Sequence, residues 1–166
     1  MSDDANTNLT PASLRTALGR FATGVTIVTC RGAAGEPVGL TANSFNALSL
    51  DPPLVLWSLR RASTNIDAFV AARHFVINVL AESQVELSRR FSSRAEDKFA
   101  DGVWSPGLHG VPVLTGSAAV FECETVSQQT AGDHVLFIGR VLNLSEAPLA
   151  PLVFQAGHYH LLGEVL

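Results

Sequence analysis

Apolar residues recur with helical spacing near the start of the chain. They stand at positions i, i+3, i+4 and i+7, which predicts an amphipathic helix: Leu14, Ala17, Leu18 and Phe21. Thr10-Pro11 precedes them, as an N-cap followed by proline in the first turn, and Gly24 is expected to end the helix. Residues 1–9 are polar and acidic, and we expect them to form a flexible tail.

The rest of the chain has the pattern of short β-strands. Apolar and β-branched runs between turn residues predict strands at residues 25–30, 38–45, 54–59, 74–80, 117–130, 135–144 and 158–162. The third of these runs, Leu54–Leu59, is apolar except for Ser58, which predicts a strand covered on both faces. Two short helices are expected after sequences typical of capping boxes, Thr64-Asn65-Ile66-Asp67 and Ser83-Gln84-Val85-Glu86.

This order of elements predicts a mainly β protein. A closed antiparallel barrel with a few short flanking helices would bury many strands without leaving exposed edges. An open α+β sandwich is the alternative. Because no repeat or clear linker divides the sequence, residues 10–166 are expected to form one domain.

Composition narrows the functional classes. Of 166 residues, 47% are apolar and 16% are charged, so we expect a packed chain with a buried oligomer interface. A net charge of -4 with a single lysine argues against nucleic-acid binding, and no apolar run approaches the roughly 18 residues of a membrane span. The N-terminus lacks the features of a secretory signal, and two isolated cysteines, Cys30 and Cys123, fit buried inert thiols in a reducing cytoplasm.

Common catalytic motifs are absent. The sequence has no glycine-rich dinucleotide or P-loop motif, no G-x-S-x-G, no C-x-x-C and no H-E-x-x-H. The H-x-H spacing of His158 and His160 would put both rings on one strand face, but no carboxylate or cysteine lies close in sequence. We therefore predict no metal site.

Two polar clusters joined by one strand are the main candidate for a ligand site. The short side chains of Thr41-Ala42-Asn43-Ser44 would let backbone groups approach a flat ring, although, on residue types alone, a strand end followed by a turn also explains them. Arg60-Arg61 and Ser63-Thr64 would suit a phosphate at a helix N-terminus, or form an ordinary cap beside solvated arginines. Since one ligand could contact both ends of the strand, we interpret the pair as a flavin site.

Two further segments could contact a nicotinamide dinucleotide. His134, in Gly132-Asp133-His134, stands where a turn enters a strand and could orient an amide or relay a proton, or serve a structural role. The run of residues 89–94 contains three arginines. It could bind phosphates or form the exposed last turn of a helix.

Four segments together resemble one family. FATGVTIVT at Phe21–Thr29, TANSFNALSLDPPLVLWSL at Thr41–Leu59, AGDHVLFIGRV at Ala131–Val141 and GHYHLL at Gly157–Leu162 resemble the short-chain flavin reductases. These are the reductase components of two-component flavin-dependent monooxygenases. The resemblance extends from about residue 10 to the end of the sequence.

The resemblance implies an FMN-binding split β-barrel of the antiparallel Greek-key type, assembled as a homodimer. It implies hydride transfer from NADH or NADPH to FMN or FAD, with reduced flavin supplied to a separate monooxygenase. It also implies a set of contacting residues. The flavin ring would contact Thr41, Ala42, Asn43 and Ser44, and the ribityl chain would contact Ser58 and Leu59. The phosphate would lie near Ser63, Thr64, Phe91 and Arg94, and the nicotinamide near His134, His158 and Tyr159.

Two alternatives remain open at this level. One is a flavin-binding carrier or sensor on the same barrel without reductase activity. The other is a split-barrel oxidase that acts directly on a small substrate. The sequence leaves undecided the choice between FMN and FAD, between NADH and NADPH, and between a tightly bound flavin and a flavin used as substrate.

Overall fold

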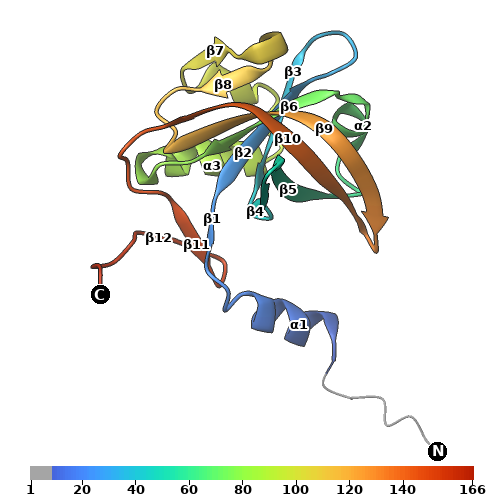
Figure 1. Ribbon diagram of the computed structural model, residues 1–166. Helices are drawn as coiled ribbons and strands as arrows, with labels where there is room; N and C mark the ends of the chain where they lie inside the picture. Colours follow the sequence, from blue (N-terminus) through green and yellow to red (C-terminus); the bar gives the residue numbers. More distant parts are fainter. Residues whose placement is uncertain (1–8) are drawn as a thin grey trace, which may run out of the picture.

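The structure, a computed structural model, describes residues 9–166 and is built mainly from antiparallel strands (Figure 1). The helices are α1 (Pro11–Leu18), α2 (Ile66–Ala71) and α3 (Val85–Ser92), with single 3-10 turns η1 (Glu82–Gln84), η2 (Lys98–Ala100) and η3 (Leu108–Gly110). The strands are β1 (Thr23–Gly24), β2 (Thr26–Arg31), β3 (Pro37–Ala42), β4 (Asn46–Leu50), β5 (Pro53–Arg60), β6 (His74–Val79), β7 (Trp104–Pro106), β8 (Pro112–Leu114), β9 (Ala119–Ala131), β10 (His134–Glu146), β11 (Val153–Gln155) and β12 (His158–His160).

Seven strands form one curved sheet in the order β3-β2-β6-β9-β10-β5-β4. Every neighbouring pair is antiparallel, which confirms the prediction for the long strands at the end of the chain. The register between β9 and β10 shifts twice, at 138/139 and 141/143, and such irregularities bend and twist long strands. Because the edge strands β3 and β4 do not pair with each other, the barrel is open along one side.

An aromatic cluster fills the interior. Trp57 on β5 stacks on Phe137 of the neighbouring β10, with ring centroids 4.8 Å apart, and meets the edge of Phe69 from α2 at 4.9 Å. Gly139 leaves room for Phe75, since a Cβ at that position would lie 2.4 Å from the Phe75 ring. The packing fixes β5 and α2, the two elements that flank residues 60–65.

A second apolar cluster holds α3 against the sheet. The fully buried Phe91 contacts Phe99 and Trp104, with ring centroids 5.0 Å and 5.4 Å away. Gly39 on β3 allows this approach, because a Cβ there would lie 2.8 Å from the Phe91 ring. The end of α3 and the segment after it are thereby placed beside β3.

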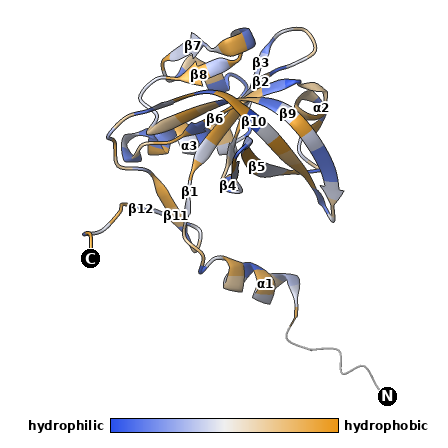
Figure 2. Ribbon diagram, viewed as in Figure 1, coloured by the Kyte–Doolittle hydropathy of each residue, from blue (hydrophilic) through white to orange (hydrophobic). Residues whose placement is uncertain are grey.

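The helix boundaries differ in part from the prediction. Thr10 caps α1 as expected, but the helix ends at Leu18, not at Gly24, which lies in β1. Within the described residues α1 has no buried side chain and projects from the barrel with its apolar residues uncovered (Figure 2). The predicted tail, residues 1–9, lies outside the described residues except for its last residue.

Both predicted capping boxes are wrong. Helix α2 starts after Asn65, whose side chain makes no cap hydrogen bond, because the Ser63 hydroxyl instead accepts from the Asn65 N–H within the preceding turn. Helix α3 starts after Gln84, whose side chain accepts from the Ala81 N–H one turn earlier. Local hydrogen bonds of the turns therefore replace the expected caps.

Five strands escaped the sequence pattern, and one was described wrongly. The missed strands are the exposed edge strand β4 and four short strands of two or three residues, β1, β7, β8 and β11. In β5, buried residues alternate with half-buried ones, so only one face is fully covered within the chain, not two as predicted. The half-buried face, which includes Ser58, borders the open side of the barrel.

Candidate functional site

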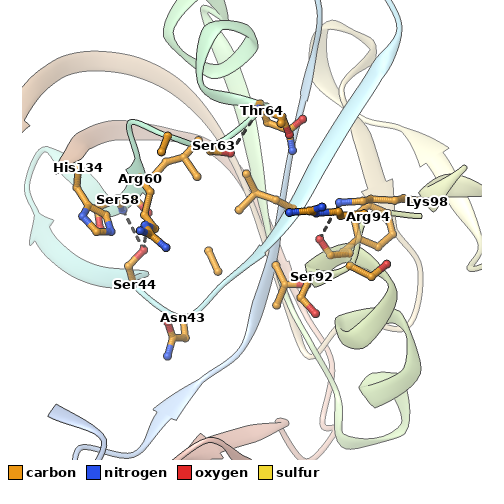
Figure 3. Close-up of a pocket in the computed structure, with 18 residues that line it drawn as sticks. Asn43, Ser44, Ser58, Arg60, Ser63, Thr64, Ser92, Arg94, Lys98 and His134 are labelled. Carbon is orange, nitrogen blue, oxygen red and sulfur yellow. Dashed lines mark hydrogen bonds between the residues drawn. The ribbon is translucent and has the colours of Figure 1, made fainter. Parts of the chain in front are cut away.

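A cavity of about 640 Å³ lies at the open side of the barrel (Figure 3). Its walls are the end of β3, the end of β5 with the loop that follows, the end of α3 and the start of β10. It gathers all the predicted site residues except His158 and Tyr159, namely Thr41, Ala42, Asn43, Ser44, Ser58, Leu59, Ser63, Thr64, Phe91, Arg94 and His134. We call it the first cavity.

The polar cluster after β3 is tied to β5 through one hydroxyl. Ser44 Oγ accepts a hydrogen bond from the Ser58 N–H and donates one to the Ser58 carbonyl, both at 2.9 Å. Strand β4 pairs with β5 only as far as Leu56, so the Ser44 hydroxyl takes the place of a strand neighbour beyond that point. The side chain of Asn43 makes no hydrogen bond within residues 9–166 and is available to a ligand.

Hydroxyls and cations line another part of the first cavity, with Thr64, Arg94 and Lys98 on its wall. The Thr64 hydroxyl and the Arg94 guanidinium have no hydrogen-bond or ionic partner in the described part of the chain. Lys98 Nζ donates to the Phe91 carbonyl at 3.1 Å, and partial burial lowers the pKa of the Lys98 ammonium. Helix α2 has only six residues, so these side chains, more than a helix dipole, make the wall attractive to an anion.

His134 occupies the first position of β10, directly across from Arg60 on β5. The sequence left open whether Asp133 and His134 pair, and the structure pairs them, with His134 Nδ1 2.7 Å from Asp133 Oδ1. This hydrogen bond lowers the pKa of the Asp133 carboxyl. When Nδ1 donates to that carboxylate, Nε2 is left as an acceptor for an amide N–H of a ligand.

A second cavity, of about 1030 Å³, adjoins the first and was not foreseen from the sequence. It lies between α1, β1 and the turn from β11 to β12, where Phe154 and Gly157 line it. Asn43, Ser44 and Ser58 line both cavities. Two ligands seated in the two cavities would therefore meet at these three residues.

His158 and Tyr159 line neither cavity. The Tyr159 hydroxyl is hydrogen-bonded to Ser88 Oγ of α3 at 2.8 Å, and its ring lies under the guanidinium of Arg89. His158 is exposed, and its Nδ1 lies 2.9 Å from the Ala156 carbonyl oxygen. Tyr159 thus connects the C-terminal hairpin to α3. A cofactor contact by His158 or Tyr159 stays a prediction.

Some cavity residues were absent from the sequence-based set: Arg60, Asn65, Ser92, Ser93 and Lys98. Arg60 belonged to a cluster that the sequence marked, and Lys98 is the only lysine of the chain. Neither the cluster that contains Arg60 nor the single lysine indicated in sequence that the segment after α3 folds back to the end of β5. Among the described residues, no cluster of metal-ligating side chains occurs, and no helix is long and apolar enough to cross a bilayer.

Comparison with known proteins identifies the family of the chain. Residues 18–163 match the family described as "Flavin reductase like domain". A probable flavin reductase of Rhizobium meliloti is 46% identical over 149 residues, 90% of this chain and 48% of that protein. The FMN reductase (NADH) SmoA of Agrobacterium fabrum is 45% identical over 147 residues, 89% of this chain and 83% of that protein.

A solved structure gives the same fold. The styrene monooxygenase flavin reductase of Pseudomonas putida S12 superimposes with a TM-score of 0.84 at 37% identity, covering 92% of this chain and 99% of that one. The open barrel is accordingly a split β-barrel, as the resemblance implied. The chain spans about half the length of the Rhizobium meliloti protein that it matches. On the match over residues 18–163, the chain belongs to the flavin reductase-like domain family.

Proposed function

We propose that this protein is an NAD(P)H-dependent flavin reductase that transfers hydride to FMN or FAD. The observation that carries the proposal is the first cavity, where backbone and amide groups lie on one side (Figure 3). On another side lie hydroxyls and the cations Arg94 and Lys98, which have no ion pair in the described residues. A flavin nucleotide has the same division between a flat polar-edged ring and a phosphate. The relative SmoA, an FMN reductase (NADH), supports the reaction class.

The residues present fit the flavin ring. Asn43 brings an amide with no hydrogen-bond partner among residues 9–166, and the small side chains of Ala42 and Ser44 leave backbone groups accessible from the cavity. The bonds between Ser44 and Ser58 hold both segments before a ligand arrives. Such preorganised donors favour the charge that develops on a reduced ring.

The residues also fit the phosphate. Thr64 and Arg94 have groups without partners in the described residues, and Arg can bind a phosphate through two parallel hydrogen bonds. The half-buried Ser63 holds the turn through its bond from the Asn65 N–H. A flavin that placed its phosphate there would extend its ring toward Asn43 and Ser44.

In this proposal the bound flavin and nicotinamide supply the redox chemistry, since hydride passes between them without a protein nucleophile. The protein holds the two rings in contact and excludes water. His134, tethered by Asp133, would position the nicotinamide amide. The second cavity meets the first at Asn43, Ser44 and Ser58, which supports it as the entry for the hydride donor.

We further propose a homodimer that delivers reduced flavin to a separate monooxygenase in the cytoplasm. The exposed apolar residues of α1 and of the turn after it, with Leu18 64% and Phe21 73% exposed, favour burial against a second copy. The Pseudomonas putida relative is the flavin reductase of styrene monooxygenase, which supports an oxygenase partner. The two cysteines are unpaired and buried, which suits a reducing compartment.

The deciding experiment is an anaerobic stopped-flow mix of protein, flavin and NADH, monitored by flavin bleaching and repeated with FAD and NADPH. We expect bleaching well above a protein-free control. Flavin binding without bleaching by any nicotinamide would favour a carrier or sensor. Bleaching that requires a third compound would favour an oxidase that acts on that compound.

A further inference from the structure

A third cavity, of about 700 Å³, opens beside the first and shares one wall with it. The start of β3 and the segment of residues 93–99 surround it. The shared wall consists of Thr64, Asn65, Ser93, Arg94 and Lys98. A ligand too long for the first cavity therefore has a continuous path past this wall.

The shared wall carries two cations, Arg94 and Lys98, and neither forms an ion pair with a carboxylate of the described residues. Arg94 has no ion pair within residues 9–166, and the Lys98 ammonium donates only to a backbone carbonyl. Arg90, one turn earlier, is by contrast paired with Asp101 and bonded to the Asp97 carbonyl. Two unpaired cations at a boundary match the two linked charges of a diphosphate.

The third cavity differs in chemistry from the first. Val38 and Phe99 give it an apolar side, and Glu96 and Asp97 add two carboxylates whose oxygens accept no hydrogen bond from the described residues. A purine can pack on the apolar side while its amino group and a ribose hydroxyl donate to the carboxylates. The carboxylates of Glu96 and Asp97 would repel an additional phosphate on the ribose of a ligand in this cavity.

The aromatic side of this cavity is fixed before a ligand binds. Phe99 meets Phe91 edge to face at 5.0 Å and Trp104 at 4.8 Å. The absence of a side chain at Gly39 permits this arrangement, because a Cβ there would lie 3.1 Å from the Phe99 ring. Preorganisation of this kind lowers the entropy cost of binding.

We propose that the site selects flavin adenine dinucleotide over FMN. This inference rests on the proposed flavin reductase function and names the substrate within it. The diphosphate lies at Arg94 and Lys98, and the adenosine lies in the third cavity. The hydroxyls of Ser63 and Thr64 then face the phosphate nearer to the ribityl chain.

The test compares the two flavins in the absence of nicotinamide, by isothermal titration calorimetry on the full chain. We expect FAD to bind at least about tenfold more tightly than FMN. Ala95→Trp fills the third cavity, which Ala95 lines without lining the first. This variant should remove most of the FAD advantage and leave the FMN affinity unchanged.

Ala34→Trp, in the exposed turn between β2 and β3, is the matched control and should alter neither affinity. Equal affinity of the unaltered protein for both flavins would overturn the selection while the reductase function stands. Ala95→Trp could instead leave the FAD affinity unchanged and raise the KM for NADH. That result would assign the third cavity to the adenosine of NADH and would also overturn the selection of FAD. Failure to bind either flavin would overturn the proposed function and this inference with it.

Discussion

Ser44 and Ser58 are joined twice, since the Ser44 hydroxyl satisfies both backbone groups of Ser58 at 2.9 Å. Ser44→Ala would leave both groups without their partner, at a cost of about 1–2 kcal/mol in the free energy of unfolding. Flavin affinity should fall as well. Urea unfolding followed by fluorescence measures the first effect.

Ser58→Ala is the control for that stability measurement, because it keeps the backbone groups that Ser44 contacts. It should unfold at nearly the same urea concentration as the unaltered protein. Equal stability of Ser44→Ala would show that water replaces the hydroxyl without cost.

Thr64→Val tests the phosphate end of the first cavity. The change keeps the shape of the side chain and removes a hydroxyl that has no protein partner in the described residues. We expect FMN affinity to fall at least about tenfold, as for loss of one hydrogen bond to a charged group. Riboflavin, which has no phosphate, should bind both proteins equally in the same titration. A parallel loss for riboflavin would instead indicate a distorted cavity.

His134→Ala tests the positioning of the hydride donor. The side chain contacts the first cavity and is tethered to Asp133, so its loss should raise the KM for NADH several-fold. Flavin affinity, measured separately, should change less. Unaltered NADH kinetics would remove His134 from the site, and an equal loss of flavin affinity would give it a different role.

The two thiols should be unreactive in the folded protein. Burial raises the pKa of Cys30 and of Cys123 to about 12, far above the pH of ordinary thiol assays. At pH 8 a disulfide reagent should therefore react slowly until denaturant is added. Because the unfolded thiols ionise at lower pH than the folded ones, both should also make stability decrease as pH rises from about 9 towards 12. Rapid labelling under native conditions would contradict this burial.

His74 should make the fold sensitive to acid. Burial lowers the pKa of His74, and the stacked ring of His109 at 3.7 Å and the nearby Arg73 lower it further, against the opposing effect of Glu124. Since the folded pKa lies below the unfolded value near 6.5, stability from this residue is present above that pH and is lost as the pH falls below it. His74→Phe keeps an aromatic ring and should flatten the pH dependence of the urea midpoint. An unchanged profile would assign the sensitivity to other groups.

The part of the site that is continuous in sequence was predictable. Thr41 to Ser44 and Ser63-Thr64 lie before and after β5 in the sequence, with the edge strand β4 also between them. The order of residue types therefore places the two groups near opposite ends of β5. The first cavity contains both groups. Their hydrogen-bond partners were not predictable, because Ser44 contacts the backbone of Ser58, which has no signature in sequence.

The remaining parts of the site and of the fold depend on contacts between residues distant in sequence. Lys98 reaches the site because Phe91 and Phe99 lock the segment after α3 against β3, a contact that no periodicity encodes. Strand β4 was missed because it is an exposed edge, without the alternation that half burial produces. A β-barrel was predictable from the number and order of apolar runs, but the closed barrel that this pattern favoured was wrong, because the edge strands β3 and β4 do not pair.

Ser88 joins three distant parts of the chain, because its carbonyl accepts from Thr41 and its hydroxyl is bonded to Tyr159. The walls of the first two cavities are thus complete only when β3, α3 and the C-terminal hairpin have come together. A flavin in the first cavity would contact β3, β5, α3 and β10 at once, so we expect it to bind after these elements have assembled and not to start their assembly. Because the flavin binds the folded state, it should slow unfolding. It should also raise the melting temperature in proportion to the logarithm of the free flavin concentration.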